Sequence, residues 1–151
     1  MNWKGYVEAI GIVAVVLSLL LVTYELRQNT LATQQAAAST YAETWRNIEL
    51  FVAGNYEFSE ILVKSIRGAE LTPHEQFRIE VFYRSIFRGW QNSFLQYQVG
   101  MLSDELWEAE RSNLEGILLG DQGMIPYWRL ERDTYTESFR ILVDGMLPTE
   151  G

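Results

Sequence analysis

Residues 9–35 read AIGIVAVVLSLLLVTYELRQNTLATQQ, an apolar run that passes directly into a polar one. The sixteen residues from Ala9 to Tyr24 carry no formal charge, and the next stretch is rich in Gln, Thr and Ala. No glycine or proline stands between the two halves, so nothing there would end a helix. The stretch therefore predicts one continuous helix, with one end in a bilayer and the other in water.

The apolar half has the length of a membrane span. Gly5 to Tyr24 would form about 30 Å of helix, which matches the hydrocarbon core of a bilayer. Aromatic residues at both ends would form an interfacial belt, and basic residues there can extend towards the headgroups. These flanking residues are Trp3, Lys4, Tyr6, Tyr24 and Arg27.

Two other interpretations compete for the apolar segment. A buried helix of a soluble bundle is compatible with an uncharged run of only sixteen residues. A cleaved signal peptide would use the small residues of QQAAAS, but the region from Thr23 to Gln35 is too long and contains two charges. The membrane anchor is the favoured interpretation.

Small and polar residues gather on one side of this predicted helix. At 100° per residue they span an arc of about 100°, with Ala14 just beside it. The residues of this side are Lys4, Glu8, Gly11, Ser18 and Glu25. Small residues four apart allow two helices to approach closely, so this side predicts association within the membrane. A pore lined by Glu8 is the sharper alternative, and chance clustering is the plainer one.

From Tyr24 onward nothing breaks the helix before Gly54. Apolar or small residues recur three and four apart, as in a seam that packs against another helix. They are Leu31, Ala38, Tyr41, Trp45, Ile48 and Val52, with Gln34 as the exception. We therefore divide the chain into a transmembrane helix with its flanks (1–27), a helical stalk (28–54) and a bundle domain (55–151).

The remaining chain predicts four shorter helices and no strand. They cover about 58–67, 73–101 and 103–119, with a last helix beginning at Pro126. Ser59 and Ser103 are the expected caps of the first and third, and Thr72, Pro73 and Glu75 form a capping box for the second. A stripe of aromatic residues along 79–101 predicts a bundle core. The fold class is all-α: one long transmembrane and stalk helix, then an aromatic-rich four-helix bundle.

Charge and composition exclude several kinds of function. The net charge is −8, which disfavours a nucleic-acid partner. The chain has no cysteine, and its single histidine, His74, cannot supply the paired ligands of a di-iron centre. A Ser–His–Asp triad would have to use this same histidine, and no nucleophile-elbow sequence accompanies it. Glu105, Glu108 and Glu110 lie near a helix start and are expected to be solvated. We therefore expect neither an enzyme nor a cofactor.

Arg84 and Arg88 lie four apart at the edge of the aromatic stripe, with Gln91 on the same line. Arginine at a core edge typically stacks on an aromatic ring or pairs with a glutamate of a neighbouring helix. A contact to an anion or a ligand carboxylate is the alternative, and it would make the domain a ligand-binding bundle.

Three stretches of the chain resemble one family of uncharacterised bacterial proteins. They are YELRQNTLA, FRIEVFYRSIFRGWQNSFLQYQVGMLSDELWE and YWRLERDTYTESFRILVDGML. The family has an N-terminal membrane helix, a helical C-terminal domain and no assigned activity. The resemblance implies that residues 27–29 and the Gln96–Tyr97–Gly100 stretch belong to a recurring pattern, and it assigns no functional residue.

Together these patterns predict a single-pass membrane protein that acts through protein association, as a homo-oligomer or as an accessory subunit of a membrane complex. A small oligomeric ion channel or transport component, with Glu8, Gly11 and Ser18 facing the axis, is the alternative. The expected location is the bacterial inner membrane with a cytoplasmic bundle, although Lys4 and Arg27 leave the positive-inside rule nearly balanced.

Overall fold

The computed structural model describes residues 3–148, and every regular element in this range is a helix. The elements are α1 (Trp3–Gly54), α2 (Tyr56–Ile66), α3 (Pro73–Gln98), α4 (Asp104–Gly120), α5 (Met124–Glu131), the 3-10 helix η1 (Arg132–Thr134) and α6 (Glu137–Asp144). The all-α prediction is confirmed, including the long N-terminal helix that crosses the boundary at Tyr24 unbroken. The side chain of Lys4 lies outside the described residues.

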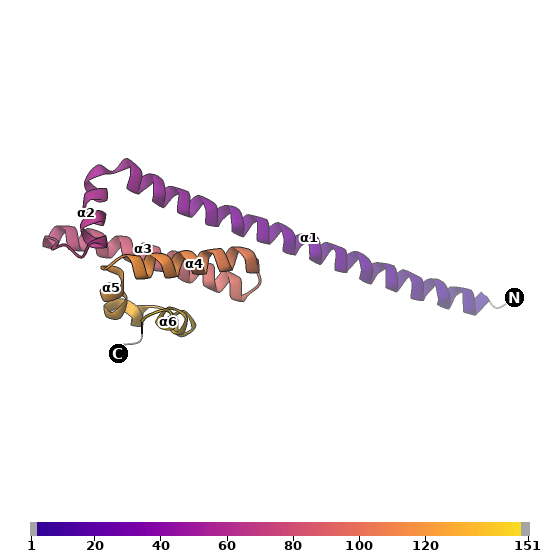
Figure 1. Cartoon of the computed structure of the whole chain (residues 1–151). Helices are drawn as coiled ribbons and strands as arrows, with labels where there is room; N and C mark the ends of the chain where they lie inside the picture. The colour runs from indigo at the N-terminus through magenta and orange to yellow at the C-terminus, as the bar shows by residue number, and fades with distance from the viewer. Residues whose placement is uncertain (1–2, 149–151) are drawn as a thin grey trace.

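The helices fold back on the second half of α1 (Figure 1). The chain turns at α2, and α3 then runs back along α1 towards the N-terminal end. α4 returns beside α3, and α5 with α6 covers the far side. The first half of α1 extends beyond this bundle, whereas the predicted stalk packs on the bundle over most of its length.

Local capping signals explain most helix boundaries. The Thr72 hydroxyl accepts a hydrogen bond from the Glu75 N–H, and the Glu75 carboxylate accepts one from the Thr72 N–H, so the capping box is confirmed. Ser103 caps α4 as predicted. The prediction that Ser59 caps α2 is wrong. Asn55 accepts from the Phe58 N–H instead, and the Ser59 hydroxyl donates to carbonyls at the end of α1.

Two predicted helices end or divide earlier than the sequence suggests. α3 stops at Gln98 because Gly100 adopts φ +74°. The N–H groups of Gly100 and Met101 donate to the carbonyls of Tyr97 and Gln96, respectively, which closes a Schellman motif. The last helix is divided after η1. Thr136 is extended there, and its N–H donates to the Gln91 side chain. This turn lets both halves pack their aromatic residues on one core.

Aromatic side chains fill the core of the bundle. Phe87, Trp90, Trp128 and Phe139 are fully buried. The ring of Phe87 stacks on Trp128 at 5.0 Å and meets Trp90 edge-on at 5.4 Å. Such pairs contribute about 0.5–1.5 kcal/mol each beyond the area that they bury. The bundle therefore has its own core, which holds the second half of α1 in place.

Candidate functional site: the exposed anchor segment and its junction with the bundle

The first half of α1, here called the anchor segment (residues 5–24), lies outside the bundle. Every side chain described in this segment is exposed, including Ile10 at 68% and Leu21 at 63%. α1 is long and apolar enough to cross a membrane by length and composition, and none of its most apolar window is buried. An apolar surface of this size is rare on soluble monomers. No described part of the chain covers it.

The small and polar residues singled out in the sequence are all exposed along the anchor segment and its exit. They are Glu8, Gly11, Ala14, Ser18 and Glu25, here called the small-residue face. The Ser18 hydroxyl donates to the carbonyl of Ala14 at 2.9 Å, so its polar group is satisfied within the helix. A side chain added at Gly11 would meet nothing within 4 Å. Another helix can therefore approach this face closely.

The second half of α1 uses its predicted seam to pack on the bundle. Ala38, Tyr41, Trp45 and Ile48 are half-buried, whereas Leu31 is 51% exposed. Trp45 lies 5.9 Å from Trp90 of α3, measured between ring centroids. The seam from residue 38 onward therefore contacts helices of the same chain.

The bundle and the small-residue face lie on different sides of α1. On a helix of 3.6 residues per turn, the side that carries residues 38, 41, 45 and 48 is about half a turn away from the small-residue face. α1 has no break between them. The bundle therefore leaves the small-residue face open.

Glu110 of α4 is the centre of the junction between α1 and the bundle. Its side chain is fully buried. The hydroxyl of Tyr41 donates to one carboxylate oxygen at 2.6 Å, and the indole N–H of Trp45 donates to the other at 3.2 Å. The prediction that Glu110 is solvated is wrong, whereas Glu105 and Glu108 are exposed as expected.

The surroundings of Glu110 favour its neutral form. Burial raises the pKa of the carboxyl above its ordinary value, and hydrogen bonds from Tyr41, Trp45, Ser93 and Asn113 offset only part of this rise. Burial, together with the hydrogen bond to Glu110, also raises the pKa of Tyr41 far above its ordinary value. Tyr41 therefore stays a protonated donor. The junction is a polar contact, buried between α1 and α4.

A second buried carboxylate ties the other end of the bundle together. The hydroxyl of Tyr83 donates to Asp121 at 2.6 Å and contacts the Ser65 hydroxyl at 2.8 Å. The Gly123 N–H donates to the other oxygen of Asp121 at 2.9 Å. A Cβ at Gly123 would lie 2.4 Å from the Ser65 oxygen, so only glycine fits. This network joins α2, α3 and the α4–α5 turn.

Arg84 contacts α5, and Arg88 contacts the turn between η1 and α6. A guanidinium nitrogen of Arg84 lies 4.0 Å from a carboxylate oxygen of Glu131, and the Arg88 guanidinium lies 5.5 Å from the centre of the Tyr135 ring. These are the two kinds of partner that an arginine at a core edge typically has. Both side chains remain largely exposed.

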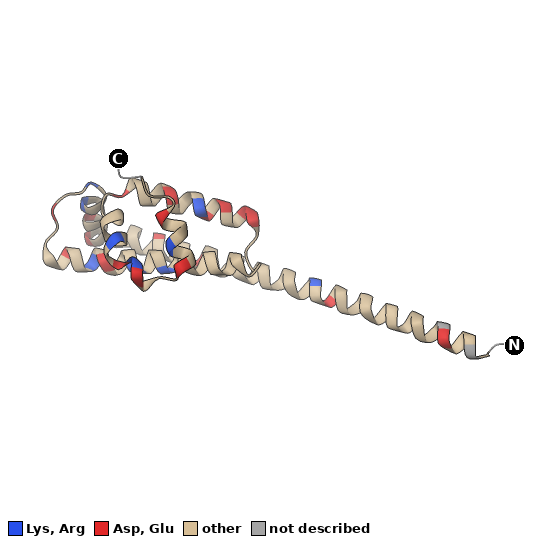
Figure 2. Ribbon diagram, turned by 90° about the horizontal axis from the view of Figure 1, so that it is seen from below, with Lys and Arg blue, Asp and Glu red and all other residues tan. Residues whose placement is uncertain are grey.

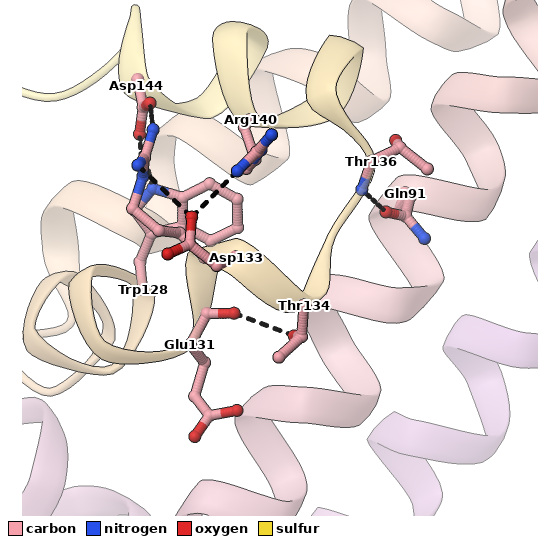
Figure 3. A network of polar contacts seen from close by, with 9 residues as sticks. Gln91, Trp128, Glu131, Asp133, Thr134, Thr136, Arg140 and Asp144 are labelled. Atoms are coloured by element: carbon pink, nitrogen blue, oxygen red, sulfur yellow. Dashed lines mark hydrogen bonds and ion pairs between the residues drawn. The ribbon is translucent and has the colours of Figure 1, made fainter.

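Asp144 joins α5 to α6 through a polar network at the surface (Figure 3). The indole N–H of Trp128 donates to Asp144 at 2.8 Å, and Arg132 forms an ion pair with the same carboxylate. Partial burial raises the pKa of Asp144. The hydrogen bonds from Arg132 and Trp128 together lower it by more than this, so the pKa lies below its ordinary value. The neighbouring Asp133 pairs with Arg140 at 2.9 Å. These contacts hold the C-terminal helices on the core.

No protein-family model, curated protein or solved structure matches this chain. The resemblance to a bacterial family therefore stays a prediction. Within residues 3–148, no group of three or more histidine, aspartate or glutamate side chains is placed to hold a metal ion.

Two apolar grooves run beside the second half of α1. One has a volume of about 530 Å³ and lies between α1, α2 and α4, with Val52, Leu62 and Ile117 on its walls. The other, of about 460 Å³, lies between α1 and α3 and includes the exposed Phe51 and Phe77. Both grooves lie at the end of α1 that is distant from the anchor segment.

Proposed function

We propose that this chain is a single-pass membrane protein that acts through protein association, as a homo-oligomer or as an accessory subunit of a membrane complex. One observation carries the proposal. A single unbroken helix exposes its apolar half completely and packs its other half on a folded bundle. A core helix of a soluble protein would be mostly buried, so the exposure of this segment favours lipid as its surroundings.

Vesicle flotation tests the anchor. The full chain should float with phosphatidylcholine vesicles and resist extraction with alkaline carbonate. A control with Leu17→Arg and Leu20→Arg should lose the association, because two charges in the middle of the segment oppose insertion. A wild-type chain that stays soluble without detergent and never floats would refute the proposal.

Association is expected along the small-residue face. This face combines small residues with a hydroxyl whose hydrogen bond is already made within the helix, and the bundle lies on the opposite side of α1. Helices that approach closely gain packing contacts that lipid does not supply. Nothing in the described part of the chain then obstructs a second helix at this face.

The mass of the protein in detergent micelles, by light scattering or native mass spectrometry, tests the association. Gly11→Leu with Ser18→Leu should shift the assembly towards monomer, because leucine keeps the helices apart. The matched control is Val13→Leu with Val16→Leu on the opposite side, which should leave the mass unchanged. Equal masses for both variants would exclude the small-residue face as the interface.

A pore is the second candidate, and one observation favours it. Glu8 is a carboxylate inside the apolar segment, on the same side as Gly11 and Ser18. In a symmetric assembly these side chains would line the axis and attract cations. Conductance in liposomes should then show a cation preference that Glu8→Gln lowers. An unchanged preference would exclude Glu8 from the pore.

We further propose that the anchor lies in a bacterial inner membrane with the bundle in the cytoplasm. The basic residues on the two sides of the span nearly balance, so the positive-inside rule does not decide the orientation. Protease treatment of spheroplasts tests the orientation: the bundle should survive until the membrane is permeabilised. Digestion in intact spheroplasts would place the bundle on the outer side.

A further inference from the structure

The loop between α3 and α4 (residues 99–103) lies at the end of the bundle nearest the anchor segment (Figure 1). It is attached to α1 there, since the amide N–H of Gln34 donates to the Gly100 carbonyl at 3.0 Å. A small cavity of about 180 Å³ separates Val99–Met101 from residues 29–34 of α1. The position of the loop along α1 is therefore fixed.

The loop lies close to where a bilayer would end. If the hydrocarbon boundary is at Tyr24, Asn29 lies about 7.5 Å and Gln34 about 15 Å beyond it along the helix. The headgroup layer occupies roughly the first 5–7 Å of this distance. Membrane helices tilt by about 20° on average. The loop lies about 10 Å from the axis of α1, so a tilt of this size towards the bundle brings it about 3 Å closer to the bilayer. After this tilt, the loop beside these α1 residues lies about 4.5–12 Å beyond the boundary, so the near edge of the loop reaches the outer headgroups.

The chemistry of the loop fits this position. Residues 98–103 carry no charge, in a chain whose net charge is −8. Val99 is 67% exposed and Met101 is 42% exposed, whereas Leu102 of the same loop is buried. Both exposed side chains leave apolar surface open to solvent. Apolar groups at a membrane surface are stabilised by entering the interface.

Acidic residues next to the loop decide the kind of lipid that fits. Asp104 and Glu105 are exposed in the first turn of α4, directly after the uncharged loop (Figure 2). These carboxylates would be repelled by anionic headgroups. The surface therefore fits zwitterionic lipids such as phosphatidylcholine.

We infer that the Val99–Met101 tip is a second membrane contact, which rests on the headgroup layer of a zwitterionic bilayer beside the anchor. The inference depends on the proposed anchor. It adds that the bundle does not swing freely on its helix. With one contact along α1 and one at the tip, the side of the bundle that faces the membrane is fixed.

Site-directed spin labelling can test the contact, because the chain has no cysteine to remove. Full-length protein in phosphatidylcholine vesicles is labelled at one of three positions: Val99→Cys at the tip, Leu20→Cys in the anchor segment, and Tyr56→Cys at the far end of the bundle. Tyr56 is 78% exposed, and α3 separates it from the tip. The measurement is the ratio of oxygen to nickel-chelate accessibility, which rises on approach to lipid.

The ratio at position 99 should be several-fold above that at position 56 and below that at position 20. Equal ratios at 99 and 56, with a high ratio at 20, would overturn the tip contact and leave the anchor intact. A water-like ratio at position 20 would overturn the anchor itself. Adding Met101→Asp to Val99→Cys should lower the ratio at position 99 to that at position 56, and a ratio that this charge leaves unchanged would count against the contact.

Discussion

Replacing Glu110 with glutamine tests the buried junction between α1 and α4 directly. The carboxyl is fully buried, and its hydrogen-bond donors Tyr41, Trp45, Ser93 and Asn113 are all neutral. Burial raises its pKa in the folded protein, whereas in the unfolded chain the pKa returns to its ordinary value near 4.5. The folded state therefore binds a proton that the unfolded state has lost over the pH range between these two values.

The sign of the effect follows from proton linkage. The stabilisation by protonated Glu110 is complete below pH 4.5 and is lost as the pH rises through the raised pKa. One proton corresponds to a slope of at most about 1.4 kcal/mol per pH unit. Glu110→Gln stays neutral at every pH and does not have this slope. Its altered hydrogen bonding adds a constant offset of about 1 kcal/mol.

The assay is guanidinium unfolding of the full chain in nonionic micelles from pH 4 to 8, followed by tryptophan fluorescence. The free energy of unfolding of Glu110→Gln minus that of wild type should rise with pH and then level off. Glu108→Gln is the matched control on the same helix, because Glu108 is exposed. Its difference should stay flat. A flat or falling difference for Glu110→Gln would show that the carboxyl is not held in a desolvated site, and the reasoning would fail.

Three further predictions concern single substitutions. Tyr41→Phe removes the 2.6 Å bond to Glu110 and should lower the free energy of unfolding by about 1.5–3 kcal/mol at pH 8, with a smaller loss at pH 4, by the same unfolding assay. Gly116→Ala should stabilise the protein by up to about 1 kcal/mol, whereas Gly100→Ala should destabilise it by about as much. Both positions have space for a Cβ, but of the two only Gly100 has a positive φ, and two changes of the same sign in the free energy of unfolding would contradict this. The hydrogen bond from Lys64, with those from Thr72, lowers the pKa of Glu75 to about 2, so any stability that the Glu75 carboxylate provides is present above pH 4.5 and lost as the pH falls towards 2. Lys64→Met should raise the pKa of Glu75 in an NMR titration, and no change would exclude the ion pair.

The features that the sequence predicted correctly depend on neighbouring residues. Helix continuity from the anchor segment to Gly54 requires only the absence of a breaker. The capping box at Thr72 requires only residues within one turn. Both are decided within a few positions of the chain, so their patterns remain valid whatever packs against them.

Glu110 was missed because its environment is made by residues far away in the sequence. Tyr41 and Trp45, which bond to it, lie 69 and 65 positions earlier. The local stretch DELWEAER is acidic and resembles a solvated helix start. One signal was available: Glu110 shares the buried side of α4 with Trp107 and Leu114, at helical spacing. A glutamate inside an apolar stripe predicts a buried polar contact.

The division after η1 depends equally on distant packing. Nothing within residues 126–144 forbids one helix, and the stripe of aromatic residues there has helical spacing. The break becomes favourable because Tyr135 and Trp128, 5.2 Å apart, both reach Phe87, and Gln91 of α3 satisfies the Thr136 N–H. A straight helix would carry one of these rings away from the core.

The buried junction at Glu110 ties the rotation of α1 to the bundle. An apolar seam alone would let α1 slide or rotate against α4, since apolar contacts are non-directional. Two directed hydrogen bonds to one carboxylate fix both the height and the rotation of α1, because a shift by one residue would turn Tyr41 away by about 100° and leave Glu110 buried without its donor. α1 continues unbroken into the anchor segment. The rotation fixed at Glu110 therefore also fixes the direction of the small-residue face, and any association in the membrane would determine how the bundles are arranged around it.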